Sequence, residues 1–160
     1  MRILGIDPGY AIVGFGVTDY SPKGFVPIEY GAILTEAHTE FPLRLKAIAE
    51  DMDYICQRFK PDSCAIEKLF FTNNQKTGID VAQARGVIVL SLVRHDIPIF
   101  EYTPLQVKQA VVGYGKAEKK QVMDMTRRIL KLENIPKPDD AADALALAIC
   151  HGHCSRGILR

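Results

Sequence analysis

Three apolar, β-branched segments fill the first 34 residues, a pattern that permits little other than a β-meander. Residues 2–7 form the first segment. Residues 11–20 alternate apolar with small or polar side chains, interrupted by Gly14 and Gly16. The turn Pro8-Gly9 joins the two and predicts an antiparallel pair. After the turn at 21–24, residues 25–34 continue the meander as a third strand.

The hydrophobic period then changes from two to that of a helix. Apolar side chains recur at helical spacing over 41–59, and Lys60-Pro61-Asp62 ends that predicted helix. A short buried strand at 63–67, a polar loop at 72–78, a helix at 79–94 and a strand at 97–102 follow. Two helices, broken near 113–115, and a last helix from 140 to about 153 complete the chain. We expect one α/β domain spanning 1–160, because 160 residues with 48% hydrophobic content suffice for one core.

Four carboxylates stand at the ends of these elements. Asp7 closes the first strand, Glu67 closes the strand at 63–67, and Asp140 and Asp143 lie on one face at the start of the last helix. If the two strands are neighbours, one edge of the sheet collects all four acids. Crowded carboxylates with no Cys/His set between them favour hard cations of the Mg²⁺ type. Two such cations can activate a water and stabilise a leaving oxygen in phosphoryl displacement.

Each acid also has a simpler explanation. Asp7 suits an Asp-Pro-Gly turn, and Glu67 suits a solvated strand end. Asp140 and Asp143 gain roughly 0.3–1 kcal/mol each from the helix dipole, with Asp139 as the expected N-cap. It is the combination of the four that favours a metal site.

Positive charge is concentrated in one segment. The net charge is only +1, but residues 104–138 contain eight basic and three acidic residues. Basic side chains beside a carboxylate site suit a phosphodiester substrate, and a solvated helical face is the alternative. Within this segment we expect Lys108 and Lys119 to contact phosphates.

Other classes of protein are disfavoured. No apolar run approaches the roughly 20 residues of a membrane span, and the N-terminus lacks a secretion signal. The four cysteines are expected to be buried free thiols of a reducing, cytoplasmic compartment. Zinc is disfavoured at Cys150-His151-Gly152-His153-Cys154, because no second pair of ligands exists, and His151 and His153 are expected at a helix end near the acids. The role of this cluster stays open.

The acidic motifs carry a family resemblance. Gly-Ile-Asp-Pro-Gly around Asp7, Ala-Ile-Glu at Glu67 and Asp-Ala-Ala-Asp-Ala-Leu-Ala at 140–146 resemble the RuvC-type Holliday-junction resolvases of bacteria. The stretches 81–87, 106–113 and 117–122 resemble the same family in the same order, so the likeness covers essentially the whole chain.

This resemblance implies a ribonuclease-H-like fold, with a mixed five-stranded sheet flanked by helices on both faces. It implies a Mg²⁺-dependent endodeoxyribonuclease with two Mg²⁺ per subunit, replaceable by Mn²⁺, held by Asp7, Glu67, Asp140 and Asp143. A homodimer would nick two strands of a four-way junction symmetrically in recombination and repair. The RuvA–RuvB branch-migration complex would deliver that junction.

Two apolar features point the same way. Phe70 and Phe71 are adjacent on an extended segment, so one ring is expected to be exposed and able to stack on an unpaired base; the resemblance favours Phe70. The helix at 79–94 is apolar nearly all round, which predicts cover by a partner subunit, or full burial within the chain as the alternative.

Two other functions remain to be weighed. A junction-binding protein without nuclease activity is the first, and the four intact acids argue against it. Gly-Ile-Asp-Pro-Gly also resembles the first phosphate loop of sugar-kinase-like ATPases, but those enzymes need two lobes and more than 160 residues.

Overall fold

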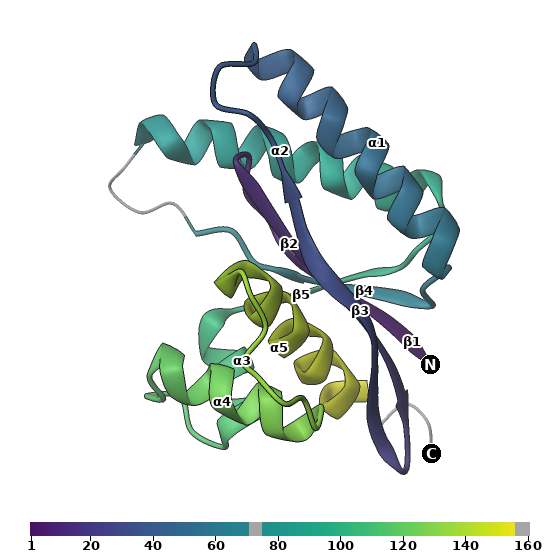
Figure 1. The fold of residues 1–160 in the computed structure, drawn as a ribbon, viewed down its shortest axis with the longest axis vertical. Helices are drawn as coiled ribbons and strands as arrows, with labels where there is room; N and C mark the ends of the chain where they lie inside the picture. The colour runs from purple at the N-terminus through teal and green to yellow at the C-terminus, as the bar shows by residue number, and fades with distance from the viewer. Residues whose placement is uncertain (71–74, 156–160) are drawn as a thin grey trace.

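The computed structural model describes residues 1–70 and 75–155, and of Gln75 and Lys76 only the backbone. Over these ranges the chain forms strands β1–β5 and helices α1–α5 (Figure 1). The strands are β1 (Arg2–Asp7), β2 (Ile12–Ser21), β3 (Gly24–Leu34), β4 (Ser63–Glu67) and β5 (Ile99–Tyr102). The helices are α1 (Phe41–Phe59), α2 (Gln75–Arg94), α3 (Pro104–Val112), α4 (Lys119–Ile129) and α5 (Asp139–Cys154).

The strands form one mixed sheet of order β3-β2-β1-β4-β5. The meander β1–β2–β3 is antiparallel, as the turn at Pro8-Gly9 predicts, whereas β4 and β5 run parallel to β1. The register pairs Ile6 of β1 with Ile66 of β4. The next residue is the last of each strand. Asp7 and Glu67 therefore end β1 and β4 at the same edge of the sheet.

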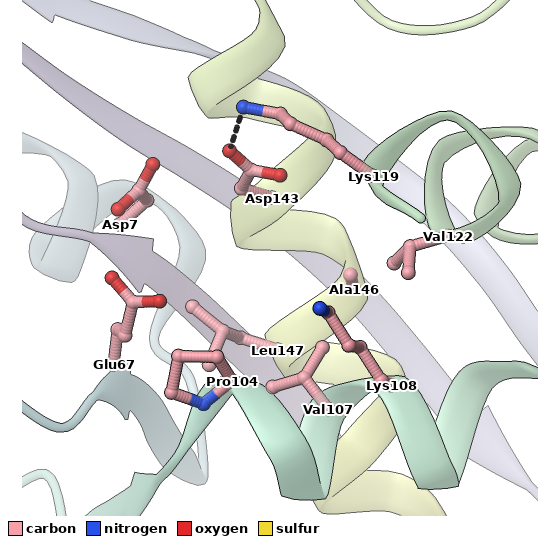
Figure 2. Close-up of a pocket in the computed structure, with 10 residues that line it drawn as sticks. All are labelled: Asp7, Glu67, Pro104, Val107, Lys108, Lys119, Val122, Asp143, Ala146 and Leu147. Atoms are coloured by element: carbon pink, nitrogen blue, oxygen red, sulfur yellow. Dashed lines mark hydrogen bonds and ion pairs between the residues drawn. The ribbon is translucent and has the colours of Figure 1, made fainter. Parts of the chain in front are cut away.

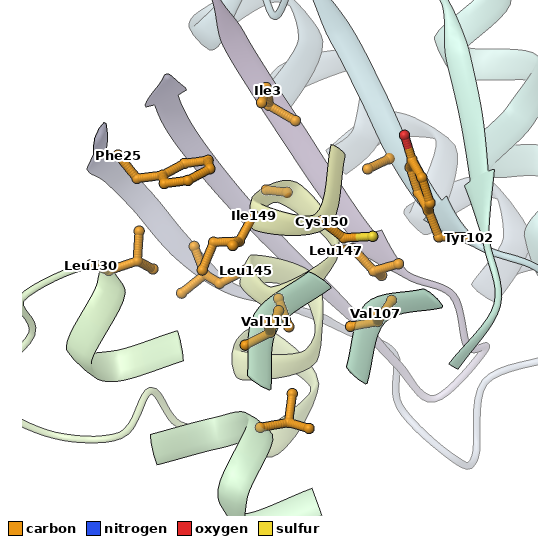
Figure 3. Close-up of a cluster of buried hydrophobic side chains, with 14 of the residues drawn as sticks. Ile3, Phe25, Tyr102, Val107, Val111, Leu130, Leu145, Leu147, Ile149 and Cys150 are labelled. Carbon is orange, nitrogen blue, oxygen red and sulfur yellow. The ribbon is translucent and has the colours of Figure 1, made fainter. Parts of the chain in front are cut away.

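Helices cover both faces of the sheet. In Figure 1, α1 and α2 lie on one side, and α3, α4 and α5 lie on the other. Successive residues of a strand point to opposite faces, so Ile3 joins the core beneath α5 and Leu4 joins the core beneath α1. Figure 3 shows the first of these cores, in which Leu145, Leu147 and Ile149 of α5 lie between the sheet and α3. These observations confirm the predicted five-stranded sheet with helices on both faces.

Glycines let α5 approach the sheet unusually closely. A Cβ added to Gly5 of β1 would lie 1.8 Å from the carbonyl oxygen of Ala144, and one added to Gly14 of β2 would lie 2.0 Å from that of Asp140. Both distances are far shorter than any contact that atoms tolerate, so no larger residue fits either position without movement. Gly14 is also the strand partner of Asp7. Gly5 of the first strand and Gly14 of the second thus set the height of α5 above the sheet.

Some predicted boundaries were wrong. Helix α2 begins at Gln75, inside the segment expected to be a polar loop, and the last strand begins at Ile99 rather than at 97. The N-cap of α5 is Pro138, so Asp139 is the first residue of the helix rather than its cap. Dipeptide patterns locate a helix end only to within a few residues.

The exposed side of α2 is apolar. Ala84, Ile88 and Leu92 are fully buried against the sheet and α1, but the side chains of Ile79, Leu90 and Val93 are 57–58% exposed. Full burial of this helix within the chain, the alternative to a partner subunit, is therefore wrong. Among the helices of the described residues, none combines the length and apolar character needed to cross a membrane.

Candidate active site

Two of the predicted acids lie side by side at the sheet edge. Asp7 ends β1 and Glu67 ends β4, and these parallel strands are neighbours in the sheet. The carboxyl ends of parallel strands meet at one edge, which is where open α/β sheets present ligand-binding groups. The backbone brings these two carboxylates together although 60 residues separate them in the sequence.

Helix α5 brings a third acid over this edge. Its Ala144 packs against Gly5, so Asp143, one residue earlier, faces the end of β1. Figure 2 shows Asp143 pointing from α5 toward Asp7 and Glu67 on the strands. These three acids line one pocket of about 230 Å³, together with Lys108 of α3 and Lys119 of α4. The sequence placed all five residues at the site, and the fold brings all five to it.

The crowded acids disfavour each other's charge. Burial, followed by the charges of Glu67, Asp143 and Asp140, raises the pKa of Asp7 to about 8. Burial and the charge of Asp143 raise the pKa of Glu67. Burial also raises the pKa of Asp143, against the opposing effect of its hydrogen bond from Lys119. Raised carboxyl pKa values in a cleft are typical of functional sites, and they mean that the fully ionised set needs a counter-charge.

The two lysines of the pocket differ in what they contact. Lys119 donates a hydrogen bond from Nζ to Oδ2 of Asp143 over 3.0 Å, and the two side chains also form an ion pair. Lys108 is half-buried on α3 and forms no ion pair with a described residue. Sequence reasoning assigned both lysines to phosphates alone, so the contact between Lys119 and Asp143 was not foreseen.

Two of the predicted residues, Asp140 and Phe70, do not line this pocket. Asp140 stands one turn before Asp143 and its charge reaches Asp7, yet it does not line the pocket. Phe70 follows β4 and its side chain is 58% exposed, as expected for a stacking residue. Phe71 lies outside the described residues.

Apolar side chains that the sequence did not single out form one wall of the pocket. They are Pro104, Val107, Val122, Ala146 and Leu147. Their helical spacing indicates packing, and only the crossing of α3, α4 and α5 places them beside the acids. Such a wall excludes water and strengthens the electrostatic interactions of the carboxylates.

The two histidines of the Cys/His cluster form hydrogen bonds to neighbouring elements. His151 is buried and shares a 2.7 Å hydrogen bond between its Nδ1 and the hydroxyl of Tyr102. Nδ1 of His153 donates a 2.9 Å hydrogen bond to the carbonyl oxygen of Ala110. Both histidines lie at the end of α5 opposite its acids, so the expectation that they lie near the acids was wrong. Cys154 is exposed, which corrects the expectation that all four thiols are buried.

The donor chemistry of the pocket fits a hard divalent cation. Its ligands are carboxylate oxygens, which Mg²⁺ and similar ions prefer, and the ammonium of Lys119 already stands beside one of them as a cation. No three acidic, His or Cys side chains in the described parts of the chain converge closely enough to hold a metal as they stand.

The fold and the site together define a class. A five-stranded sheet of this order, with carboxylates at the ends of two neighbouring inner strands and on a helix packed over them, is a ribonuclease-H-like nuclease architecture. Comparison with known proteins agrees with this class. The structure of Thermus thermophilus RuvC superimposes with a TM-score of 0.91 at 32% identity, covering 98% of this chain and 96% of that one.

Sequence comparison gives the family. The model of the family described as crossover junction endodeoxyribonuclease RuvC matches residues 3–151. The crossover junction endodeoxyribonuclease RuvC of Brevibacillus brevis is 56% identical over 151 residues, covering 94% of this chain and 91% of that protein. The chain of T. thermophilus RuvC in complex with Holliday junction substrate is 29% identical, with a TM-score of 0.90 and coverage of 98% and 96%. The chain belongs to the RuvC family of crossover junction endodeoxyribonucleases.

Proposed function

We propose that this chain resolves four-way DNA junctions by paired, symmetric, metal-dependent nicks in homologous recombination and DNA repair. The observation that carries the proposal is the pocket where Asp7, Glu67 and Asp143 meet, with two lysines beside them. Family membership supplies the substrate, because a relative of the same fold was solved with a Holliday junction. We take residues 1–160 as one nuclease domain, since all described strands form a single sheet and the described helices lie on its two sides.

Asp7, Glu67, Asp140 and Asp143 would hold the cations, which we propose to be two Mg²⁺ per subunit with Mn²⁺ as a substitute. Bound there, the cations would supply Lewis-acid chemistry and stabilise charge on the reacting oxygens. The chain supplies the geometry. Strand ends fix two carboxylates, and α5 fixes the other two at a height set by Gly5 and Gly14. The apolar wall covers one side of the carboxylates.

Lys108, Lys119 and Phe70 are the proposed DNA contacts. Both lysines line the pocket, so a phosphate group placed on the acids would lie within their reach. Phe70 is exposed three residues after Glu67, which suits stacking on a base unpaired at the crossover.

The apolar side of α2 supports a homodimer. Ile79, Leu90 and Val93, with Gly86 between them, lie on one helical face, at successive spacings of seven, four and three residues. A second copy of this face would remove these side chains from water. Leu90→Glu is expected to shift the sedimentation of the protein from dimer to monomer, whereas Glu50→Gln on the exposed side of α1 is not. A variant at position 90 that stays dimeric would place the interface elsewhere.

Delivery of the junction by the RuvA–RuvB branch-migration complex, and action in the cytoplasm, belong to the same proposal. Family membership supports the first. The second is supported by the four cysteines, all of which are free thiols.

Nicking of a synthetic four-way junction in Mg²⁺ tests the proposal. Asp7→Asn keeps the shape of the side chain and removes its charge, so it is expected to bind junctions nearly as well as wild type while losing nicking. Asp51→Asn, the same change on an exposed turn of α1, is the control and should nick normally. Nicking by Asp7→Asn above about a tenth of the wild-type rate, a barrier change of only about 1.4 kcal/mol, would remove Asp7 from the metal site. A wild-type protein that binds junctions without nicking them would favour the non-cleaving alternative.

A further inference from the structure

Lys119 occupies an unusual place for a residue expected to hold DNA. Its Nζ lies 3.0 Å from Oδ2 of Asp143, inside the pocket that the acids line. Lys108 lines the same pocket without an ion pair to any described residue. The two lysines thus have the same charge and the same pocket, and only one of them pairs with a carboxylate.

The charge of Lys119 acts on the whole acidic set. It opposes the rise in the pKa of Asp7, of Glu67 and of Asp143. One ammonium therefore offsets part of the repulsion among three carboxylates. Because no other described basic residue pairs with them, Lys119 is the counter-charge that the described residues supply to the carboxylates.

The lysine is fixed at its backbone, whereas most of its side chain is exposed to solvent. Helix α4 begins at Lys119, and the preceding residue Glu118 donates its backbone N–H to Oε1 of Gln121 over 2.8 Å. Ala117 is 1% exposed and fixes the approach to the helix. The side chain of Lys119 is nevertheless 59% exposed. A long, solvated stem on a fixed Cα allows the ammonium to leave Asp143 without any movement of the fold.

We propose that Lys119 is a tethered counter-ion that holds Asp143 in the metal-free protein and is displaced from it by the divalent cation. Displacement both completes the carboxylate set and releases one ammonium at the mouth of the pocket, where a phosphate of the DNA backbone can take it. Cation binding and DNA binding are then coupled, since each favours the state in which Lys119 has left Asp143. This inference rests on the proposed function for the identity of the second partner.

Two consequences follow that Lys108 does not share. Lys119 competes with the cation, so removing it should strengthen cation binding to the free protein. Lys119 contacts DNA only after displacement, so the number of phosphate contacts should rise by about one when the cation is present, and the salt dependence of binding should steepen accordingly.

The first test measures Mn²⁺ binding to DNA-free protein by the loss of the free-ion electron paramagnetic resonance signal. Sites that Asp7→Asn abolishes are counted as pocket sites. Lys119→Met is expected to bind Mn²⁺ at these sites at least tenfold more tightly than wild type, and Lys119→Arg about as wild type. Lys108→Met, which removes the same charge without removing an ion pair, should change the affinity less than threefold. Equal affinities for Lys119→Met and wild type, or equal gains in both Met variants, would overturn the proposal.

The second test measures junction affinity against salt concentration, in EDTA and in Ca²⁺. The slope for wild type should steepen by about one unit in Ca²⁺, whereas the slope for Lys119→Met should be the same in both. A slope for wild type that Ca²⁺ leaves unchanged would overturn the coupling. Failure of wild type to nick junctions would instead refute the proposed function, and the difference in Mn²⁺ affinity would stand regardless.

Discussion

The two faces of the sheet are built on opposite principles. Beneath α1 and α2 the core consists of large side chains, among them Ile48 and Met52, which are fully buried. Beneath α5 the core also contains large side chains, such as Leu145 and Ile149, but at one point small residues meet, with Gly5 on the strand against Ala144 and Ala148 on the helix. Side chains alone separate the layers on the first face, whereas the second face adds close approaches of backbone to backbone at Gly5 and Gly14.

The two faces therefore differ in what they contribute: the first mainly stabilises the fold, and the second positions the acids. Large side chains stabilise by the apolar area that they remove from water, and cores of this kind tolerate swaps that conserve volume. Backbone contact leaves no such tolerance, because the helix height is fixed by atoms that cannot change rotamer. The acids Asp140 and Asp143 stand on the second kind of face, where position is held most tightly.

The largest expected effect comes from one methyl group on the α5 face. Gly5→Ala places a Cβ 1.8 Å from the carbonyl oxygen of Ala144, so α5 must shift; we expect a loss of about 3 kcal/mol or more. The melting temperature should fall by roughly 6–12 °C, and nicking should fall with it because Asp143 moves. Ile48→Val on the opposite face should cost only about 1 kcal/mol. Melting of Gly5→Ala within about 2 °C of wild type would erase the contrast between the faces.

The second prediction concerns the raised pKa of Asp7, which lies below α5. The folded chain holds the Asp7 proton up to about pH 8, whereas the unfolded chain releases it near 3.8, so stability falls as the pH rises between these values. Asp7→Asn should therefore stabilise the metal-free protein at pH 7 by about 1 kcal/mol or more. Thermal melting in EDTA measures this gain, with Asp51→Asn as the control. A lower melting temperature for Asp7→Asn would show that the carboxylate cluster does not strain the fold.

A third, smaller effect is expected at the far end of α5. Burial lowers the pKa of His151, so the neutral ring is favoured in the folded state. Its contribution to stability is complete above the unfolded pKa of about 6.5 and is lost as the pH falls below it. His151→Asn keeps an acceptor for Tyr102 but cannot titrate. Between pH 7 and pH 5 its stability should fall less steeply than that of wild type, by at most about 1.4 kcal/mol per pH unit; parallel curves would contradict this.

The smallest effect on stability should come from outside both faces. Phe70 is 58% exposed, so Phe70→Ala should melt within about 1–2 °C of wild type. If its ring stacks on an unpaired base, cleavage of fully paired junctions loses roughly 1–3 kcal/mol of that interaction. A junction with unpaired bases at the crossover should recover much of the rate. A large drop in melting temperature would instead place the ring in a core.

The sequence predicted those parts of the molecule that depend on local patterns. Alternation gave the meander, helical spacing gave α1, and the motif around Asp7 gave the strand end that carries the first acid. That β1 and β4 are neighbours was the condition on which the acidic edge depended, and the structure meets it. Such features need only neighbouring residues, or one pairing, to be inferred.

Features that depend on several elements meeting were missed. The contact of Lys119 with Asp143 needs α4 and α5 to cross, and no spacing within either segment encodes that crossing. Gly14 was noticed only as an interruption of a strand, and Gly5 was not singled out, because their close neighbours Asp140 and Ala144 are remote in sequence. The start of α2 was placed too late because polar residues at 75–78 resemble a loop as much as a first helical turn.

The order in which the chain contributes to the pocket has a consequence for when activity can arise. Its carboxylates come from the first strand, the fourth strand and the last helix, and α5 must seat on β1 before Asp143 meets Asp7. Contacts between such distant segments form late in folding, after the long loops between them have closed. A chain still being synthesised, or one unfolded locally at α5, therefore holds no assembled set of acids. Because the acids come from distant segments, the chain can cut DNA only after its fold is complete.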